Sequence, residues 1–289
     1  MQKKPHIRIG AAPNRSLTIA KAAPRHALLI LLCGFSIFPI YWMLTSSFKP
    51  LAEIFGAGLL PAAPTFENYP EAWKSMNFLR LAGNSATIAT AQTLLQLFTA
   101  TLSAYALTRW EFPGRSFIFL LYSLTWLIPF QAIMIPNYVT AVNLGLRGTL
   151  LGVILPFSAS SFAILSIYNA FKSFPKALIE AAVMDNLSEL SILFRIILPN
   201  IKATAASMGI LLFINGFNEY IWGLLMASNI ENAPIQVGLR NLMFLEGNIT
   251  GNAWGTLMAG ATLTSLPIFL LYVILRKQII NSFVRWGIK

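Results

Sequence analysis

One carboxylate, Glu219, lies within a long apolar stretch of the sequence, and three polar residues accompany it: Asn215, Asn218 and Tyr220. An ionisable residue in an apolar span marks a candidate functional site, because a charge there is costly. Two amides, a phenol and a carboxylate offer the donors and acceptors that a hydroxyl-rich solute needs. This group therefore predicts a contact with a polar solute. The alternative is a wetted or paired position near the outer end of the helix, where Glu219 serves packing alone.

An earlier apolar stretch carries Gln131 and Asn137, together with Trp126. Aromatic rings stack on the faces of sugars, and they are also ordinary residues of the membrane interface. The two amides offer the same kinds of hydrogen bond as those near Glu219. We expect Trp126 to serve packing, and both roles stay open for Gln131 and Asn137.

The sequence disfavours catalytic and metal chemistry. No G-x-x-x-x-G-K-[ST] pattern occurs, so the chain has no loop of the type that cradles the phosphates of ATP. The single cysteine, Cys33, excludes a disulfide within the chain and a cysteine-ligated metal site. Both histidines, His6 and His26, fall in the N-terminal tail, where we expect solvated residues. No apolar stretch pairs a nucleophile with a base, which argues against an enzyme embedded in the membrane.

Long apolar segments must position these residues. Hydrophobic residues make up 56% of the chain and charged residues 11%, a composition typical of an integral membrane protein. A helix needs about 20 residues to cross the apolar core of a bilayer. Six segments are long enough, and we expect each to form one helix, kinked where proline occurs: 27–48, 81–107, 117–140, 149–170, 204–227 and 257–275.

The distribution of lysine and arginine predicts the orientation of these helices. With the N-terminus in the cytoplasm, 16 of the 21 basic residues lie on the cytoplasmic side, which is the bias that sets membrane topology. Six spans then return the C-terminus to the cytoplasm. The net charge of +11 therefore reflects topology, and not nucleic-acid binding. A cleaved secretory signal is disfavoured, because the first apolar run is too long and lacks a nearby cleavage site.

This topology places the segment EAAVMDNLSELSILFRIILP (180–199) in the cytoplasm, between the fourth and fifth spans. Its first residues favour helix, and apolar residues recur at helical spacing over 187–198. Asn186 tolerates a positive φ and is predicted to end the first helix. Pro199 is predicted to end the second, since the residue before a proline is pushed out of helical geometry. The alternative is an amphipathic helix on the membrane surface.

Segment 180–199 resembles the signature loop of binding-protein-dependent ABC importer permeases, in which EAA-x-x-D precedes a helical run and I-x-L-P. Further motifs, in the same order, are similar to the smaller, six-helix permease of the maltose-type, carbohydrate-uptake branch. The resemblance covers roughly residues 30–285. These motifs are FPIYWMLTSSFKP (38–50), AYALTRWEFPGR (104–115), LGLRGTLLG (144–152) and FNEYIWGLL (217–225). The sequence departs from the family pattern at three positions: Asn186 replaces glycine, Phe217 replaces tryptophan and Gly223 replaces proline.

The resemblance implies an all-α membrane protein with the six transmembrane helices of the type I ABC importer permease fold, working by alternating access. In such importers the signature loop is a coupling helix that docks into a cleft on a cytoplasmic ATPase. For coupling to the ATPase, the resemblance implies a polar contact by Glu180 and close approach at Ala181 and Ala182. Asp185 and Asn186 are expected to shape the turn. Leu198 and Pro199 belong to the I-x-L-P sequence that ends the motif.

The resemblance also implies a complex in the inner membrane of a bacterium. Its expected members are a second homologous permease, which makes a heterodimer, two copies of an ABC ATPase and a periplasmic solute-binding protein, surrounded by lipid. ATP and Mg²⁺ belong to the ATPase, so this chain is a translocation subunit without its own cofactor or enzymatic activity. The outer connection over 228–256 resembles the loop that reaches into the sugar cleft of the binding protein; a plain connector is the alternative.

The expected organisation is a basic cytoplasmic tail (1–26), a first helix (27–48), a periplasmic loop (49–80), a five-helix permease core (81–275) and a C-terminal cytoplasmic tail (276–289). The coupling loop occupies about 172–200 within the core. The expected solute is a sugar or oligosaccharide, with an anionic oligosaccharide as the narrower candidate. The competing class is a stand-alone secondary transporter or channel for a small polar solute, although the repeats and paired intramembrane charges typical of such proteins are not evident.

Overall fold

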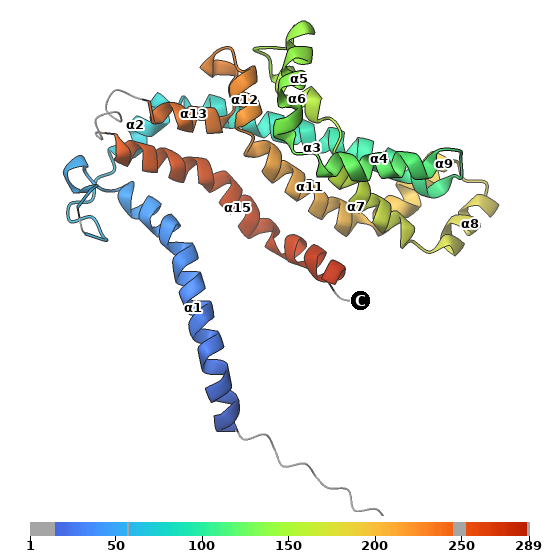
Figure 1. The fold of residues 1–289 in the computed structure, drawn as a ribbon, viewed down its shortest axis with the longest axis horizontal. Coiled ribbons are helices and arrows are strands. Elements are labelled where there is room, and N and C mark those ends of the chain that lie inside the picture. Colours follow the sequence, from blue (N-terminus) through green and yellow to red (C-terminus); the bar gives the residue numbers. More distant parts are fainter. Residues whose placement is uncertain (1–14, 57, 245–252, 288–289) are drawn as a thin grey trace, which may run out of the picture.

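Helices form all the regular structure in the described part of the chain. The structure, a computed structural model, describes residues 15–56, 58–244 and 253–287. Within these ranges every element is an α, 3-10 or π helix, which confirms the all-α fold class. Four helices form the frame (Figure 1): α1 (Arg15–Ser46), α3 (Phe78–Arg109), α11 (Lys202–Phe217) and α15 (Trp254–Gly287).

α3 is the central helix of the bundle. It packs on α11, on α7 (Ser161–Lys172) and on α13 (Ile235–Leu242). Buried residues occur along its length and include the polar side chains of Gln92 and Gln96. Because protein covers α3 on several sides, it can carry polar residues that a lipid-facing helix would not tolerate.

The expected spans correspond to helices, but only three of them are single helices. Pro24–Ser46 within α1 and Trp254–Lys277 within α15 are each long and apolar enough to cross a membrane. Three bent pairs of helices also qualify if each pair is one span, which gives up to five. α3 adds a less apolar helix of 32 residues, about 48 Å long at 1.5 Å per residue.

The third expected span is two helices rather than one. α4 (Arg115–Leu127) and α5 (Phe130–Asn143) meet at 101°. Pro129 lies at the bend, and the residue before it, Ile128, has an extended ψ of 118°. A proline pushes its predecessor out of helical geometry, which accounts for the break.

The fourth and fifth expected spans are also interrupted. α6 (Leu150–Ile154) and η2 (Leu155–Phe157) meet α7 at 43°. The side chain of Ser160 caps the start of α7 by accepting a hydrogen bond from the backbone N–H of Ala163. α11 ends at Phe217, and a separate helix, α12 (Ile221–Met226), follows it. The prediction of one continuous helix over 204–227 is therefore wrong.

Short helices gather at the two ends of α3 (Figure 1). α2 and α13 lie near its first residues, whereas α8 and α9 lie near its last residues. The remaining bounds are η1 (Leu51–Glu53), α2 (Asn68–Ser75), α8 (Lys176–Met184), α9 (Glu189–Ser191), η3 (Ile192–Ile197), α10 (Leu198–Asn200) and η4 (Ile230–Asn232).

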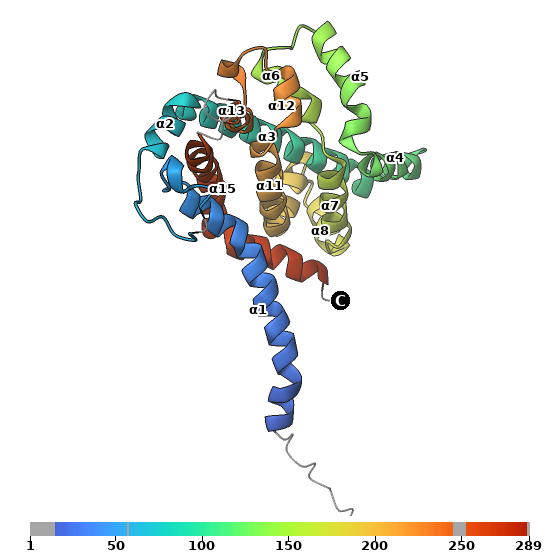
Figure 2. The ribbon, with the colours of Figure 1, turned by 60° about the vertical axis from the view of Figure 1, so that its left-hand side comes forward.

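α1 stands apart from most of the bundle, as both views show (Figures 1 and 2). It packs on α15, and residues 24–40 are exposed. An apolar helix with so much exposed surface requires cover by lipid or by another membrane subunit.

Candidate coupling loop and solute cavity

α8 carries the Glu-Ala-Ala motif and projects at one end of the molecule (Figure 1). Glu180 and Ala181 are exposed, and the apolar side chains of Leu178 and Met184 are exposed with them. Ala182 is different, because it is only 3% exposed and packs within an apolar cluster of its own chain. Its small size therefore serves internal packing, in contrast to the expectation that it permits close approach of a partner.

Asn186 turns the chain at the end of α8, as the sequence predicts, with a φ of 56°. The N–H of Leu187 donates to the carbonyl of Ala182 at 3.1 Å, and the N–H of Asn186 donates to Val183 at 3.0 Å. Asp185 is the C-terminal cap of the helix. Asparagine adopts the left-handed conformation more readily than most residues, so the turn forms without the glycine usual in the family.

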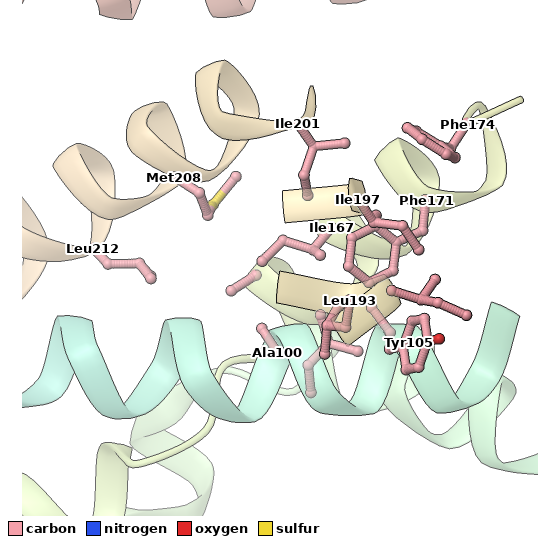
Figure 3. Close-up of a cluster of buried hydrophobic side chains, with 14 of the residues drawn as sticks. Ala100, Tyr105, Ile167, Phe171, Phe174, Leu193, Ile197, Ile201, Met208 and Leu212 are labelled. Atoms are coloured by element: carbon pink, nitrogen blue, oxygen red, sulfur yellow. The ribbon is translucent and has the colours of Figure 1, made fainter. Parts of the chain in front are cut away.

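The second arm of the loop, from α9 to α10, is anchored in the protein. Ile192 and Leu193 are fully buried in a cluster that α3, α7 and α11 also line. Figure 3 shows Leu193 and Ile197 beside Tyr105 of α3 and Phe171 of α7. Burial of this arm within the chain argues against an amphipathic helix resting on the membrane surface. The loop thus consists of an exposed arm, α8, and an anchored arm, α9 to α10.

Pro199 does not end the anchored arm in the predicted way. Leu198 keeps helical angles of −57° and −43°, so the prediction for the residue before this proline is wrong. The break follows at Ile201, with φ −100° and ψ 10°, where the chain turns by 81° into α11. The stretch before Leu198, η3, is π-helical. Pro199 itself lies at the start of α10, a position where a helix tolerates proline.

The anchored arm is joined to the end of α3 by a charged contact. Arg109 Nη2 donates to Glu189 Oε1 at 2.8 Å, and Arg109 Nε donates to Oε2 at 3.0 Å. The hydroxyl of Tyr105 donates to Oε2 at 2.5 Å. The Arg109 guanidinium holds the pKa of the Glu189 carboxyl below its ordinary value. Sequence reasoning assigned no role to these three residues.

A cavity of about 430 Å³ lies beside this contact, between α8 and the ends of α3 and α7. Glu180 borders it, and so do the cationic side chains of Arg109, Arg115, Lys172 and Lys176. The exposed arm therefore has a charged recess next to its glutamate. Such a recess can receive a charged side chain of a docking protein.

A second cavity, of about 330 Å³, lies where three of the expected spans are broken. Trp126 borders it near the end of α4, Ser160 at the start of α7, and Glu219 between α11 and α12. Irregular backbone at membrane depth occurs where it is covered by protein or lines a water-filled cavity. The lining is largely polar or aromatic: Gln92, Gln96, Trp126, Phe157, Ala159, Ser160, Phe162, Leu212, Asn215, Gly216 and Glu219.

Gln92 and Gln96 are cavity residues that sequence reasoning missed. Gln92 donates to the carbonyl of Val153 at 2.9 Å, and Gln96 donates to the carbonyl of Phe157 at 2.7 Å. Both bonds join α3 to the interrupted fourth span. The available signal was two glutamines four residues apart in an apolar segment, since that spacing places them on one helical face.

Glu219 combines a structural contact with a position on the cavity. Its Oε1 accepts a hydrogen bond from the backbone N–H of Trp222 at 2.9 Å, which caps the first turn of α12. Asn215 lines the same cavity. Asn218 instead accepts a hydrogen bond from Gln236 at 3.1 Å.

The remaining predicted solute residues do not line this cavity. Gln131 and Tyr220 are exposed and Asn137 is half-buried, and none of the three is part of the lining. Gln131 and Asn137 lie on α5, which the 101° bend carries away from α4. The break at Pro129 therefore separates them from Trp126, which precedes it.

The outer connection predicted over 228–256 is partly helical, and its residues 245–252 lie outside the described part of the chain. Arg80 joins Glu231 in an ion pair of 3.0 Å, which ties η4 to the start of α3. Glycine replaces the family's proline at position 223. The structure accounts for this departure, because a β-carbon there would clash with the ring of Pro234.

Comparisons with known proteins agree with these features. Residues 96–284 match the model of the family described as binding-protein-dependent transport system inner membrane component. The arabinooligosaccharides transport system permease protein AraQ of Bacillus subtilis is 29% identical, over 88% of this chain and 90% of that protein. The sn-glycerol-3-phosphate transport system permease protein UgpE of Brucella abortus is 30% identical, over 90% and 94% of the two chains.

A solved structure gives the same fold. The chain superposes with a TM-score of 0.82 on a chain of a bacterial ABC transporter involved in the import of the acidic polysaccharide alginate, covering 92% of this chain and 99% of the other. The sequence identity is 23%, so this likeness concerns the fold alone. Together with the match over 96–284, these findings show that the chain belongs to the family of binding-protein-dependent transport system inner membrane components and is an ABC importer permease.

Proposed function

We propose that this chain is the translocation subunit of an importer for a hydroxyl-rich saccharide. The names of several relatives support a sugar, since AraQ belongs to an arabinooligosaccharides transport system and LacG of Rhizobium radiobacter to a lactose transport system. The observation that carries the proposal is the two-armed loop, with Glu180 on an exposed arm and Leu193 on an anchored one. A loop of this form can receive force from outside and pass it to the bundle.

The exposed arm supplies the docking surface for a cytoplasmic ATPase. Glu180 offers a charge beside a recess with several cations, and Ala181 leaves room for a partner's backbone. Asp185 and Asn186 set the direction of the arm through the turn. Leu198 and Pro199 join the anchored arm to α11.

The full transporter contains a second homologous permease, two ATPase copies and a periplasmic solute-binding protein. ATP and Mg²⁺ bind to the ATPase, and this chain contributes movement rather than catalysis. The exposed apolar surface of α1 supports a position among lipid or against the second permease. Most lysine and arginine residues fall in the segments assigned to the cytoplasmic side, and this bias supports an inner-membrane topology with both termini in the cytoplasm.

The solute passes the cavity where the spans are broken. Gln92, Gln96, Asn215 and Ser160 provide neutral donors and acceptors, and Trp126 provides an aromatic face for a sugar ring. Glu219 is the charged residue of this lining, and no lysine or arginine belongs to the lining. A neutral sugar unit therefore fits this cavity better than an anionic one.

Purification and reconstitution test the proposal. Affinity capture of this chain from its native membrane is expected to bring down an ATPase and a second permease. The complex, placed in liposomes, is expected to hydrolyse ATP faster with a binding protein loaded with the transported sugar. Capture of the chain alone, followed by uptake that needs an ion gradient and no ATP, would show a stand-alone secondary transporter instead.

A further inference from the structure

We propose that Glu189, Arg109 and Tyr105 form a brace that makes α3 move with the coupling loop, so that force on α8 reaches the solute cavity. These three residues are called the α3 brace below. The inference rests on the proposed function, because it assigns the route by which docking force enters the bundle. Glu189 and Arg109 are positioning residues in this scheme, since neither lines the solute cavity.

The contacts of the α3 brace fix the orientation of the Arg109 guanidinium against the Glu189 carboxylate, and not only the distance between them. Arg109 meets Glu189 with two nitrogens, Nη2 and Nε, at 2.8 and 3.0 Å from the two carboxylate oxygens. Tyr105 donates to one of the same oxygens. A paired fork of this kind resists rotation better than a single contact. It joins residues 80 positions apart in the chain.

Stability alone is a weak reason for this contact. The side chains of Arg109 and Glu189 are 26% and 40% exposed, and exposed ion pairs contribute little to folding. The anchored arm is already held by fully buried residues, among them Ile192 and Leu193. Loss of the brace therefore leaves the arm packed in the apolar cluster that it shares with Tyr105 of α3, but it removes the oriented contact at Arg109, at the last residue of α3.

α3 connects the brace to the cavity without a break. It is one helix from Phe78 to Arg109, so the cavity residue Gln96 lies about 14 Å from Tyr105 and about 20 Å from Arg109 along the axis, at 1.5 Å per residue. Gln92 and Gln96 are hydrogen-bonded to Val153 and Phe157 at the interrupted fourth span. A displacement of α3 along its axis therefore shifts these two glutamines and pulls on that interruption.

The brace is tested in the complete complex by comparing sugar uptake with ATP hydrolysis. Glu189→Gln removes the charge with little change of size, and Arg109→Glu with Glu189→Arg exchanges the charges. The matched control is Glu71→Gln on α2, at the other end of α3, where the carboxylate accepts one hydrogen bond from Ser75. The readouts are subunit stoichiometry, sugar-stimulated ATPase rate, and sugar transported per ATP hydrolysed.

Glu189→Gln is expected to keep the subunit stoichiometry and an ATPase rate within about twofold, while sugar per ATP falls about tenfold. The charge exchange is expected to recover at least half of that loss, and Glu71→Gln to match the unaltered complex. Unchanged sugar per ATP in Glu189→Gln would overturn the brace while the proposed function stands. The brace would also be overturned if Glu189→Gln complexes dissociate and the charge exchange does not restore the subunit stoichiometry. The contact would then serve assembly alone. An unaltered complex without ATP-driven uptake would overturn the proposed function and the brace together.

Discussion

Gln92 of α3 donates a hydrogen bond of 2.9 Å to the backbone carbonyl of Val153 in α6. This contact is buried, and it joins the central helix to a span that is interrupted a few residues later. A backbone carbonyl near such an interruption needs a hydrogen-bond partner, and the side-chain amide of Gln92 supplies it here. The glutamine therefore stabilises a local break that also shapes the solute cavity.

Replacement of Gln92 by leucine is expected to lower both stability and uptake. The change removes the donor and leaves the Val153 carbonyl unpaired, which costs about 1–3 kcal/mol. Denaturant unfolding of the complex in detergent measures the loss, and uptake at several sugar concentrations measures the effect on transport. Thr87→Val is the control on the same helix, since the Thr87 hydroxyl donates to the carbonyl of Gly83 within α3. Equal stability of Gln92→Leu and the unaltered complex would contradict this role.

Two substitutions of Glu219 separate its contact with solute from its cap on α12. Glu219→Gln keeps an oxygen that can accept the Trp222 N–H, so stability is expected to remain, while the KM for sugar rises several-fold. Glu219→Ala also removes the cap, at a cost of about 1 kcal/mol. A panel of sugar concentrations in proteoliposomes gives the KM. An unaltered KM in Glu219→Gln would restrict this carboxylate to capping.

The turn at Asn186 allows a prediction about local conformation. Asn186→Gly is expected to leave stability nearly unaltered, because glycine adopts positive φ without steric strain. Asn186→Val is expected to destabilise the loop by about 1–2 kcal/mol, since a branched side chain is strained at a φ of 56°. Thermal unfolding and ATPase capture report on the two variants. Similar stability of the valine and glycine variants would show that the turn does not need a positive φ.

Acid is expected to weaken the α3 brace. The pKa of Glu189 is lowered in the folded protein, mainly by its hydrogen bond with Arg109. Its contribution to stability is therefore fully present above the unfolded value, about 4.3, and is lost as the pH falls through the lower folded value. Unfolding measured between pH 6 and pH 3 checks this dependence, which is expected to stay below about 1 kcal/mol because both side chains are partly exposed. Glu189→Gln is expected to lose the part of the pH dependence of stability that comes from this carboxyl. The same pH profile in the variant and in the unaltered complex would contradict a lowered pKa at Glu189.

Charge reversal at Glu180 is expected to uncouple ATP hydrolysis from uptake. Glu180 is exposed on α8, so lysine fits there sterically. It adds a cation to a recess that Arg109, Arg115, Lys172 and Lys176 already border, and it reverses the charge offered to the ATPase. Transport by reconstituted vesicles is expected to fall at least tenfold, and Glu71→Lys at the other end of α3 serves as the control. Unchanged transport by Glu180→Lys would contradict a docking role for this residue.

The sequence predicted local features better than relations between distant segments. The turn at Asn186 follows from the tolerance of one residue for positive φ, and the helices follow from apolar segments of sufficient length. The bends are harder to predict, because proline in a membrane helix is compatible with a kink or with a full break. At Pro129 the helix breaks fully, with Ile128 in extended geometry. The break before α12 contains no proline, and its signal is the side chain of Glu219, which caps the new helix.

The α3 brace and the glutamines of the cavity were not predicted because their partners lie far away in the chain. Arg109 and Glu189 are 80 residues apart, and Gln92 and Val153 are 61 residues apart. A sequence pattern reports which face of a helix a residue occupies, but not which helix covers that face. The burial of Ala182 has the same origin, since its neighbour Ala181 is exposed on the same helix.

Cross-linking at these two alanines tests the central claim, that α8 docks on an ATPase, most directly. Ala181→Cys and Ala182→Cys are made separately in a Cys33→Ser background, and the complex is treated with a short reagent that joins cysteine to nearby amines. The ATPase is expected to be linked to position 181, which is exposed, and not to position 182, which is 3% exposed. Absence of any link from position 181 to the ATPase, in a complex that still transports sugar, would contradict the account.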